Sequence, residues 1–318
     1  MPSVPDPDRA IVLFATPAYR PMAEAMVALG GLELGELEVR YFPDGERYLR
    51  IHTPVAGRRV ALLGGTVSDG DTLLLYDLAF AASKYGALDL SLLLPYFGYS
   101  TMERVTEPGE VVTAKSRARL LSSIPLAHHG NTVYLLDLHT RGLPNYFEGP
   151  VTTIHLSARD LVLDAIRELA DGRRYVLACT DAGRAKWVES LANDLGVGAA
   201  FVFKRRLDGA TTEITAMAAS VEDRMVVIYD DMIRTGGSLL DAAEAYRRAG
   251  AAHVAAVATH GVLPDDALRK LARSGLLDAV VTTDSHPRAL AVENDFLRLR
   301  SVAPMLRDAL VDGRYLEA

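Results

Sequence analysis

Residues 229–250, YDDMIRTGGSLLDAAEAYRRAG, hold the pattern that is most informative about chemistry. A hydrophobic strand expected over 225–229 delivers two adjacent carboxylates, Asp230 and Asp231, and a short loop over 233–237 then leads into an amphipathic helix. Backbone without side chains can approach an anion closely, and the first N–H groups of a helix attract negative charge. The residues expected around that anion are Arg234, Thr235, Gly236, Gly237 and Ser238. This loop is therefore a predicted phosphate site.

The two carboxylates need a role of their own, because they would repel a phosphate. Asp230 and Asp231 can instead accept hydrogen bonds from vicinal sugar hydroxyls. A phosphate site and a diol site one loop apart describe a ribose 5-phosphate. The alternative is an aspartate-rich turn in which Ser238 caps the helix. The combination of strand, paired acids, Thr-Gly-Gly-Ser and amphipathic helix is more specific than such a turn.

Other polar side chains follow buried strands at the point where each strand is expected to end. These residues are Asp137 and His139, Asp181, Lys204 and Arg206, and His260. A spacing of two residues puts Asp137 and His139 on one side of their strand, and it does the same for Lys204 and Arg206. Open parallel sheets bind ligands at the carboxyl ends of their strands, so we expect these groups to converge on one edge in each half. The alternative is that such polar residues only mark strand ends.

The elements that position these groups alternate along the chain. Nearly continuous apolar runs lie at 11–15, 60–65, 90–97, 132–139, 175–181, 199–204, 225–231, 253–260 and 279–284. Amphipathic helical patterns lie at 71–86, 111–124, 157–170, 184–195, 238–249 and 264–274. Continuous apolar runs are typical of strands buried on both faces of a parallel sheet. The pattern predicts an α/β fold of two similar domains, 1–152 and 153–318, with the last helix able to return to the first domain.

Composition narrows the class of protein. The chain has 318 residues, 34 basic and 41 acidic, with a net charge of −7, so it lacks the basic footprint of a nucleic-acid binder. A single cysteine, Cys179, excludes an internal disulfide framework and suits a reducing compartment. No apolar run reaches the length that spans a bilayer, and the first residues do not resemble a signal peptide. We expect a soluble cytoplasmic protein with no membrane or nucleic-acid partner.

The stretch 229–250 resembles the phosphoribosyl diphosphate (PRPP) loop of type I phosphoribosyltransferases and PRPP synthases. Six further segments look like PRPP synthase segments in the order of that family: 42–51, 95–125, 135–149, 179–187, 203–206 and 257–263. Phosphoribosyltransferases are generally a single such domain and lack the first half. The chain is thus similar to the ribose-phosphate diphosphokinase (PRPP synthase) family over nearly its whole length. The resemblance implies two phosphoribosyltransferase-like domains, each a mostly parallel sheet flanked by helices.

The activity that the resemblance implies is transfer of the β,γ-diphosphoryl group of ATP, or of another nucleoside triphosphate, to the 1-hydroxyl of ribose 5-phosphate. The products are PRPP and AMP. The family also implies a homo-oligomer built from dimers, up to a hexamer. Two alternatives stay open: a catalytically weak or regulatory PRPP synthase homologue, and a phosphoribosyltransferase that uses PRPP.

The family's roles are carried over to matching residues. His139 and Asp181 match residues that serve Mg²⁺ and the triphosphate, and a sparse protein ligand set suits this ion. Lys204 and Arg206 match residues that stabilise charge as the diphosphoryl group moves. The polar segment that follows, 207–216, is expected to be a mobile loop.

The nucleotide site matches two segments. Its expected residues are Phe42, Asp44, Gly45, Glu46, Thr101, Met102, Glu103 and Arg104. Common family members carry Arg-Gln-Asp and two basic residues where this chain reads TMERV over 101–105, and an aspartate where it has Arg234. The segment 95–125 looks like the plant-type second class, which uses several nucleoside triphosphates. The resemblance therefore implies looser recognition of the base.

Overall fold

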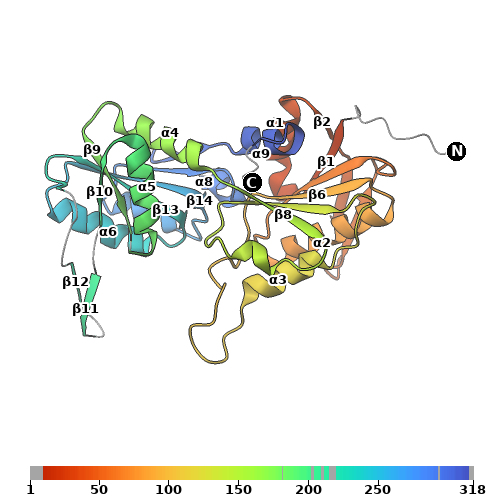
Figure 1. The fold of residues 1–318 in the computed structure, drawn as a ribbon, viewed down its shortest axis with the longest axis horizontal. Helices are drawn as coiled ribbons and strands as arrows, with labels where there is room; N and C mark the ends of the chain where they lie inside the picture. Colours follow the sequence, from red (N-terminus) through yellow and green to blue (C-terminus); the bar gives the residue numbers. More distant parts are fainter. Residues whose placement is uncertain are drawn as a thin grey trace. The chain divides into compact units, whose positions relative to one another are not determined.

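The structure is a computed structural model that describes residues 10–180, 182–201, 204–208, 211–214, 220–292 and 294–314 (Figure 1). Its contacts divide the chain into two units, Met1–Ser157 with Val302–Ala318, and Ala158–Ser301. The first unit thus ends at Ser157 rather than at residue 152. It also includes the last helix, α9 (Ala303–Val311), which packs against α1 (Arg20–Ala28). No helix within these ranges is long and apolar enough to cross a membrane.

Unit 1 is built on a six-stranded parallel sheet in the order β2-β1-β5-β6-β7-β8. The strands are β1 (Ile11–Ala15), β2 (Leu32–Leu34), β5 (Arg59–Leu63), β6 (Asp89–Leu94), β7 (Asn131–Leu136) and β8 (Val151–Leu156). Helices α2 (Asp69–Lys84) and α3 (Thr113–Ser122) pack their apolar residues on one face of this sheet, and α1 packs against β1 (Figure 1). An antiparallel hairpin, β3 (Leu37–Tyr41) and β4 (Arg47–Ile51), follows β2.

Unit 2 repeats this plan, with a six-stranded parallel sheet in the order β10-β9-β13-β14-β15-β16. The strands are β9 (Tyr175–Cys179), β10 (Gly198–Ala200), β13 (Met225–Ile233), β14 (His253–Gly261), β15 (Ala279–Thr283) and β16 (Leu297–Arg300). The helices are α4 (Arg159–Ala170), α5 (Ala185–Leu195), α6 (Gly237–Arg248), α7 (Ala267–Arg273) and α8 (Pro287–Val292).

Alternation along the central strands explains why their sequences are apolar throughout. In β13, Val226 and Ile228 pack with residues of α6 and α7, whereas Val227 and Tyr229 pack with residues of α4 and α5. Successive side chains of a strand point to opposite faces, so a sheet covered by helices on both faces needs apolar residues at every position. The predicted α/β fold of two similar halves is therefore confirmed.

Two details differ from the sequence prediction. The run 199–204 is not one strand: β10 ends at Ala200, and Lys204 begins a separate strand, β11 (Lys204–Asp208). That strand pairs with β12 (Thr211–Ile214) in an antiparallel hairpin, so the segment expected to be a loop contains strands. Polar residues paired across two short strands give neither a continuous apolar run nor a clear amphipathic pattern. In the order of elements along the chain, this hairpin lies between β10 and β13, just as β3 and β4 lie between β2 and β5 in unit 1.

Candidate active site

The paired acids lie within β13, which continues past them to Ile233. Asp231 is almost fully buried, with 4% of its surface exposed, and Asp230 is partly buried. The Oδ2 atom of Asp230 accepts a hydrogen bond of 2.9 Å from the Thr180 hydroxyl, which follows the neighbouring strand β9. Its Oδ1 atom accepts a second, also of 2.9 Å, from the backbone N–H of Asp231. The Asp230 carboxylate is thus fixed in orientation.

Arg184 joins the two acids, a contact that the sequence analysis missed. It ends the short 3-10 turn that precedes α5. Its Nη2 atom lies 2.5 Å from Oδ2 of Asp231, and its Nε atom lies 3.9 Å from Oδ1 of Asp230. The sequence holds one signal of this role, a basic residue just after an expected strand end, but it does not say which partner that residue meets.

The environment of Asp230 changes its acidity. Burial, the hydrogen bond with Asp231 and the charge of Asp231 raise the pKa of the Asp230 carboxyl to about 7, against the lowering effects of the Thr180 hydroxyl and the Arg184 guanidinium. Near neutral pH the Asp230 carboxyl is therefore partly protonated. Such a pair can accept hydrogen bonds from two neighbouring hydroxyl groups.

The predicted phosphate loop follows directly and has the backbone that such a site needs. Gly236 has a φ of +77°, and a Cβ atom there would lie 2.6 Å from Cδ2 of the Leu271 side chain. Only glycine adopts this conformation without strain and leaves Leu271 in place. The loop residues Arg234, Thr235 and Ser238 are exposed to solvent. The loop therefore presents two hydroxyls and a guanidinium at an accessible surface, whereas Gly236 itself is buried.

The start of α6 is unlike the start of the equivalent helix α2. In the part of the chain that the structure describes, no side chain caps α6, and its first turn holds no acid. Helix α2 is capped by the Ser68 hydroxyl, which accepts from the N–H of Asp71, and its first turn holds Asp69 and Asp71. Its N–H groups and dipole are thus already compensated by the protein. The open helix end lies in unit 2, next to the paired acids.

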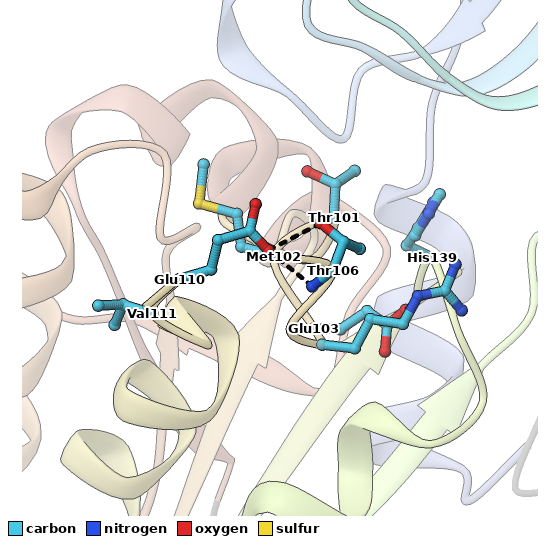
Figure 2. A pocket seen from close by; sticks show the side chains of 8 residues that line it. Thr101, Met102, Glu103, Thr106, Glu110, Val111 and His139 are labelled. Atoms are coloured by element: carbon cyan, nitrogen blue, oxygen red, sulfur yellow. Dashed lines mark hydrogen bonds and ion pairs between the residues drawn. The ribbon is translucent and has the colours of Figure 1, made fainter. Parts of the chain in front are cut away.

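Unit 1 holds a second candidate site, a pocket of about 390 Å³ (Figure 2). It is lined by Thr101, Met102, Glu103, Arg104, Thr106, Glu110, Val111 and His139. The structure thus brings four predicted nucleotide residues together with His139, which follows β7 in the chain. The other lining residues come from the loop between β6 and α3. The strands that precede these residues, β6 and β7, both have their carboxyl ends at this edge of the sheet, as expected for a ligand site of a parallel sheet.

Hydrogen bonds within the loop shape this pocket. The Oε2 atom of Glu110 accepts from the Thr106 N–H at 2.7 Å, the Thr106 hydroxyl at 2.7 Å and the Glu107 N–H at 3.0 Å. These bonds, the one from the Thr106 N–H above all, lower the pKa of the Glu110 carboxyl. The Tyr146 hydroxyl donates to the carbonyl of Glu103 at 2.5 Å. A loop of polar residues is thereby held in one conformation without a regular element.

Arg104 supplies a guanidinium group to the pocket. Its side chain is 75% exposed, and its Nε atom lies 3.7 Å from Oε1 of Glu103, whose side chain is only 16% exposed. Because the Arg104 side chain is exposed and its contact with Glu103 is long, the guanidinium can turn toward a phosphate.

The other predicted nucleotide residues, 42–46, form the turn between β3 and β4. The N–H of Phe42 donates to the Glu46 carbonyl at 2.8 Å, and the N–H of Gly45, at a φ of +92°, donates to the Phe42 carbonyl at 2.9 Å. Asp44 accepts from the Glu46 N–H at 3.0 Å. The Phe42 ring is 42% exposed, with the Arg40 guanidinium 5.3 Å from its centre. None of these residues is among those that line the pocket in Figure 2.

The remaining predicted residues are placed only in part. Lys204 and Arg206 lie in β11, in register with Ile214 and Thr212 of β12. Asp181 lies outside the described residues. Within the described ranges, no group of three or more His, Cys, Asp or Glu side chains could hold a metal ion by itself.

Two family models match the chain. The model of the N-terminal domain of ribose phosphate pyrophosphokinase matches residues 11–124, and that of the phosphoribosyl synthetase-associated domain matches residues 211–310. A ribose-phosphate pyrophosphokinase of Synechococcus elongatus is 31% identical over an alignment that covers 98% of this chain and 92% of the relative. The chain belongs to the ribose-phosphate pyrophosphokinase family.

Other relatives agree with this membership in the pyrophosphokinase family. A ribose-phosphate pyrophosphokinase of Methanopyrus kandleri is 32% identical, over 87% of this chain and 91% of the relative. The crystal structure of phosphoribosylpyrophosphate synthetase from Mycobacterium smegmatis superposes with a TM-score of 0.84 at 26% identity, covering 96% of this chain and all of that one. The match extends over both units, so the family resemblance and the two-domain architecture predicted from the sequence are confirmed.

Proposed function

We propose that this protein is a ribose-phosphate diphosphokinase that makes PRPP and AMP from ribose 5-phosphate and ATP. The observation that carries the proposal is the juxtaposition in unit 2 of an acid pair, one member buried and the other partly buried, and an uncapped, glycine-containing helix start. Together these features match the two ends of a ribose 5-phosphate. Membership of the pyrophosphokinase family over nearly the whole chain supports the reaction.

The sugar phosphate is assigned to unit 2. The phosphate group binds to the N–H groups and hydroxyls of Thr235, Gly236, Gly237 and Ser238, with Arg234 beside it. Asp230 and Asp231 accept hydrogen bonds from the ribose hydroxyls. Charge separates the two functions, because the positive end of the α6 dipole favours the phosphate while the carboxylates favour hydroxyl donors.

The nucleotide is assigned to the unit 1 pocket of Thr101–Arg104 and His139. Its volume of about 390 Å³ lies within the usual range of small-molecule pockets, roughly 300–1,000 Å³. Met102 and Val111 supply apolar surface for a base, and Arg104 supplies a charge for phosphates. The resemblance of segment 95–125 to the class that uses several nucleoside triphosphates supports the use of ATP and of other nucleoside triphosphates. The turn of Phe42, Asp44, Gly45 and Glu46 contributes to a nucleotide site across a subunit contact, so we also propose a homo-oligomer built from dimers.

In the reaction, the anomeric hydroxyl of ribose 5-phosphate attacks the β-phosphorus of the nucleotide. A bond forms between the ribose O1 and this phosphorus, and the bond from the phosphorus to the oxygen that bridges to the α-phosphate breaks. AMP leaves with that oxygen, and the hydroxyl proton passes to solvent. A loose transition state needs positioning and charge stabilisation rather than a strong base. Lys204 and Arg206 supply that charge, and the reaction takes place in the cytoplasm.

We propose Mg²⁺ as the cofactor, as the family membership supports. Mg²⁺ keeps several waters, prefers oxygen ligands and is usually held by one or two protein groups together with substrate phosphates. No ready-made cage exists among the described residues, and His139 with Asp181 would hold an ion that arrives with the nucleotide. When bound, the ion neutralises charge on the phosphate oxygens.

A donor panel tests the proposal. Ribose 5-phosphate and Mg²⁺ are incubated with ATP, GTP, CTP or UTP, with and without inorganic phosphate, and PRPP is followed by ³¹P NMR. We expect PRPP and the matching nucleoside monophosphate from at least one donor. Lys204→Ala should abolish turnover and leave the fold intact. The absence of nucleoside monophosphate with every donor would refute the activity and favour a regulatory homologue. Thr101, Met102 and Arg234, which differ from the residues of common family members, are the reason to consider this alternative. Consumption of PRPP with a nucleobase would instead support a phosphoribosyltransferase.

A further inference from the structure

Arg184 lies in the sugar site but has no role in the reaction described above. It comes from the turn after β9, whereas the acids belong to β13, so its ion pair spans two elements that are far apart in the chain. Its side chain is 20% exposed, and the Asp231 side chain that it meets is 6% exposed. This is a largely buried pair and not a surface contact.

We propose that Arg184 is a positioning residue of the sugar site: its guanidinium holds Asp231 as a carboxylate beside Asp230, so that the pair presents fixed acceptors to a vicinal diol. The inference rests on the proposed function, because the diol is that of ribose 5-phosphate. It adds a specificity-determining residue that lies outside the PRPP loop itself.

Electrostatics supplies the first argument. Two adjacent carboxylates repel each other, and a buried carboxylate without a partner is costly. A phosphorylated ligand brings further negative charge to the loop that begins three residues after Asp231. One cation between the acids lessens their mutual repulsion, gives the buried carboxylate a partner and offsets part of the ligand's negative charge. Arg184 is placed to do so, 2.5 Å from Asp231 and 3.9 Å from Asp230.

Geometry supplies the second argument. An ionised carboxylate has about four acceptor sites, so a carboxylate held by one guanidinium nitrogen can still accept from a sugar hydroxyl. Asp230 is already oriented by the Thr180 hydroxyl and the Asp231 N–H. Asp231 is oriented by Arg184 through its Oδ2 atom. With both carboxylates held, their separation is set before a ligand arrives, and preorganisation of this kind improves affinity.

The test compares Arg184→Gln, which removes the charge, with Arg184→Lys, which keeps it. Arg167→Gln is the matched control, because Arg167 forms an exposed ion pair with Asp164 in the same unit. Titration calorimetry gives the affinity of each folded variant for ribose 5-phosphate and, separately, for a non-hydrolysable ATP analogue. Fluorescence of Trp187, the single tryptophan, verifies that unit 2 is folded.

We expect Arg184→Gln to weaken ribose 5-phosphate binding at least about tenfold, the size typical of a lost charge-assisted contact. Affinity for the ATP analogue should stay within about twofold, since unit 1 is assigned that ligand. Arg184→Lys should recover part of the loss, and Arg167→Gln should match wild type.

Three results would overturn the inference. These are unchanged sugar affinity in Arg184→Gln, tighter binding that marks the ion pair as a competitor of the sugar, and equal loss of both ligands without rescue by lysine. A wild-type protein that binds no ribose 5-phosphate would refute the proposed function together with the inference. A wild-type protein that binds it without turnover would refute only the reaction, and the affinities would still decide the role of Arg184.

Discussion

The glycine at the start of α6 gives the sharpest mutational test of the sugar-phosphate loop. Gly236→Ala places a methyl group where the φ is +77° and where the Leu271 side chain is 2.6 Å away. The left-handed conformation costs roughly 1–2 kcal/mol for a residue with a side chain. Displacing a fully buried leucine adds about 1–3 kcal/mol of overpacking. We therefore expect unit 2 to lose about 2–5 kcal/mol of stability, or the loop to change shape.

Two other glycines of unit 2 separate these effects. Gly275→Ala meets the same type of strain, at a φ of +65°, but no atom lies within 4 Å of the new Cβ, so it should cost only roughly 1–2 kcal/mol. Gly237 is in the loop but has an ordinary φ, and the nearest atom to a new Cβ, Oγ1 of Thr235, lies 4.0 Å away, so the stability of Gly237→Ala should stay within about 1 kcal/mol of wild type. Urea unfolding followed by Trp187 fluorescence gives the stabilities, because Trp187 belongs to α5 of this unit.

Ligand binding completes this test. Binding is measured without urea, at a temperature at which all variants are folded. Under these conditions Gly236→Ala should bind ribose 5-phosphate at least about tenfold more weakly than wild type, since the loop N–H groups move with the backbone. Gly275→Ala should bind it like wild type. If Gly236→Ala matched Gly237→Ala in stability and wild type in affinity, the account of this loop would be wrong.

Three further predictions follow from the same structure. Glu110→Gln should raise the nucleotide KM several-fold and leave the ribose 5-phosphate KM unchanged, because the carboxylate that accepts the hydrogen bonds of Thr106 loses its charge. A nucleotide KM equal to that of wild type would contradict this prediction. Sugar affinity should fall as the pH drops from about 8 to 6, because the Asp230 carboxyl, whose pKa is raised to about 7, takes up a proton there; calorimetry at both pH values checks this, and a flat profile would count against it. Burial above all, and then the charges of Arg288 and His260, lower the pKa of His286 from 6.5 to about 4. As the pH falls, the unfolded chain therefore takes up this proton before the folded chain does. The contribution of neutral His286 to the free energy of unfolding is fully present above about pH 6.5 and is lost toward pH 4. The loss should reach about 3 kcal/mol, and His286→Leu should remove that part of the pH dependence in urea unfolding; an identical slope in both proteins would refute it.

The sequence predicts the centre of each sheet well and its margins poorly. Central strands such as β13 and β14 are buried on both faces, so continuous apolar runs reveal them. The edge strand β8 reads VTTIHL and is only partly buried, and β2 and β16 have three and four residues. Such short or half-polar segments carry no apolar run. Their strand conformation comes from pairing with a neighbour, which local sequence does not encode.

The site shows the same limit. The types and spacing of Asp230, Asp231 and Gly236 predict the sugar loop, because that chemistry lies within one short segment. The contact of Arg184 with Asp231 joins residues 47 positions apart, and the meeting of His139 with Thr101–Arg104 joins two separate loops. Contacts of this kind depend on how strands are ordered in the sheet, so only the folded chain reveals them. The role of Phe42 stays a prediction, since Phe42 is not among the residues that line the pocket.

We propose that one loop of unit 2 binds the phosphate of ribose 5-phosphate while two acids bind its hydroxyls. A crystal structure of the protein with ribose 5-phosphate tests it most directly. We expect phosphate oxygens about 3 Å from the N–H groups of Thr235–Ser238 and ribose hydroxyls about 3 Å from the carboxylates of Asp230 and Asp231. A sugar phosphate bound elsewhere, or an empty loop at a saturating concentration of ribose 5-phosphate, would refute this assignment of the sugar site.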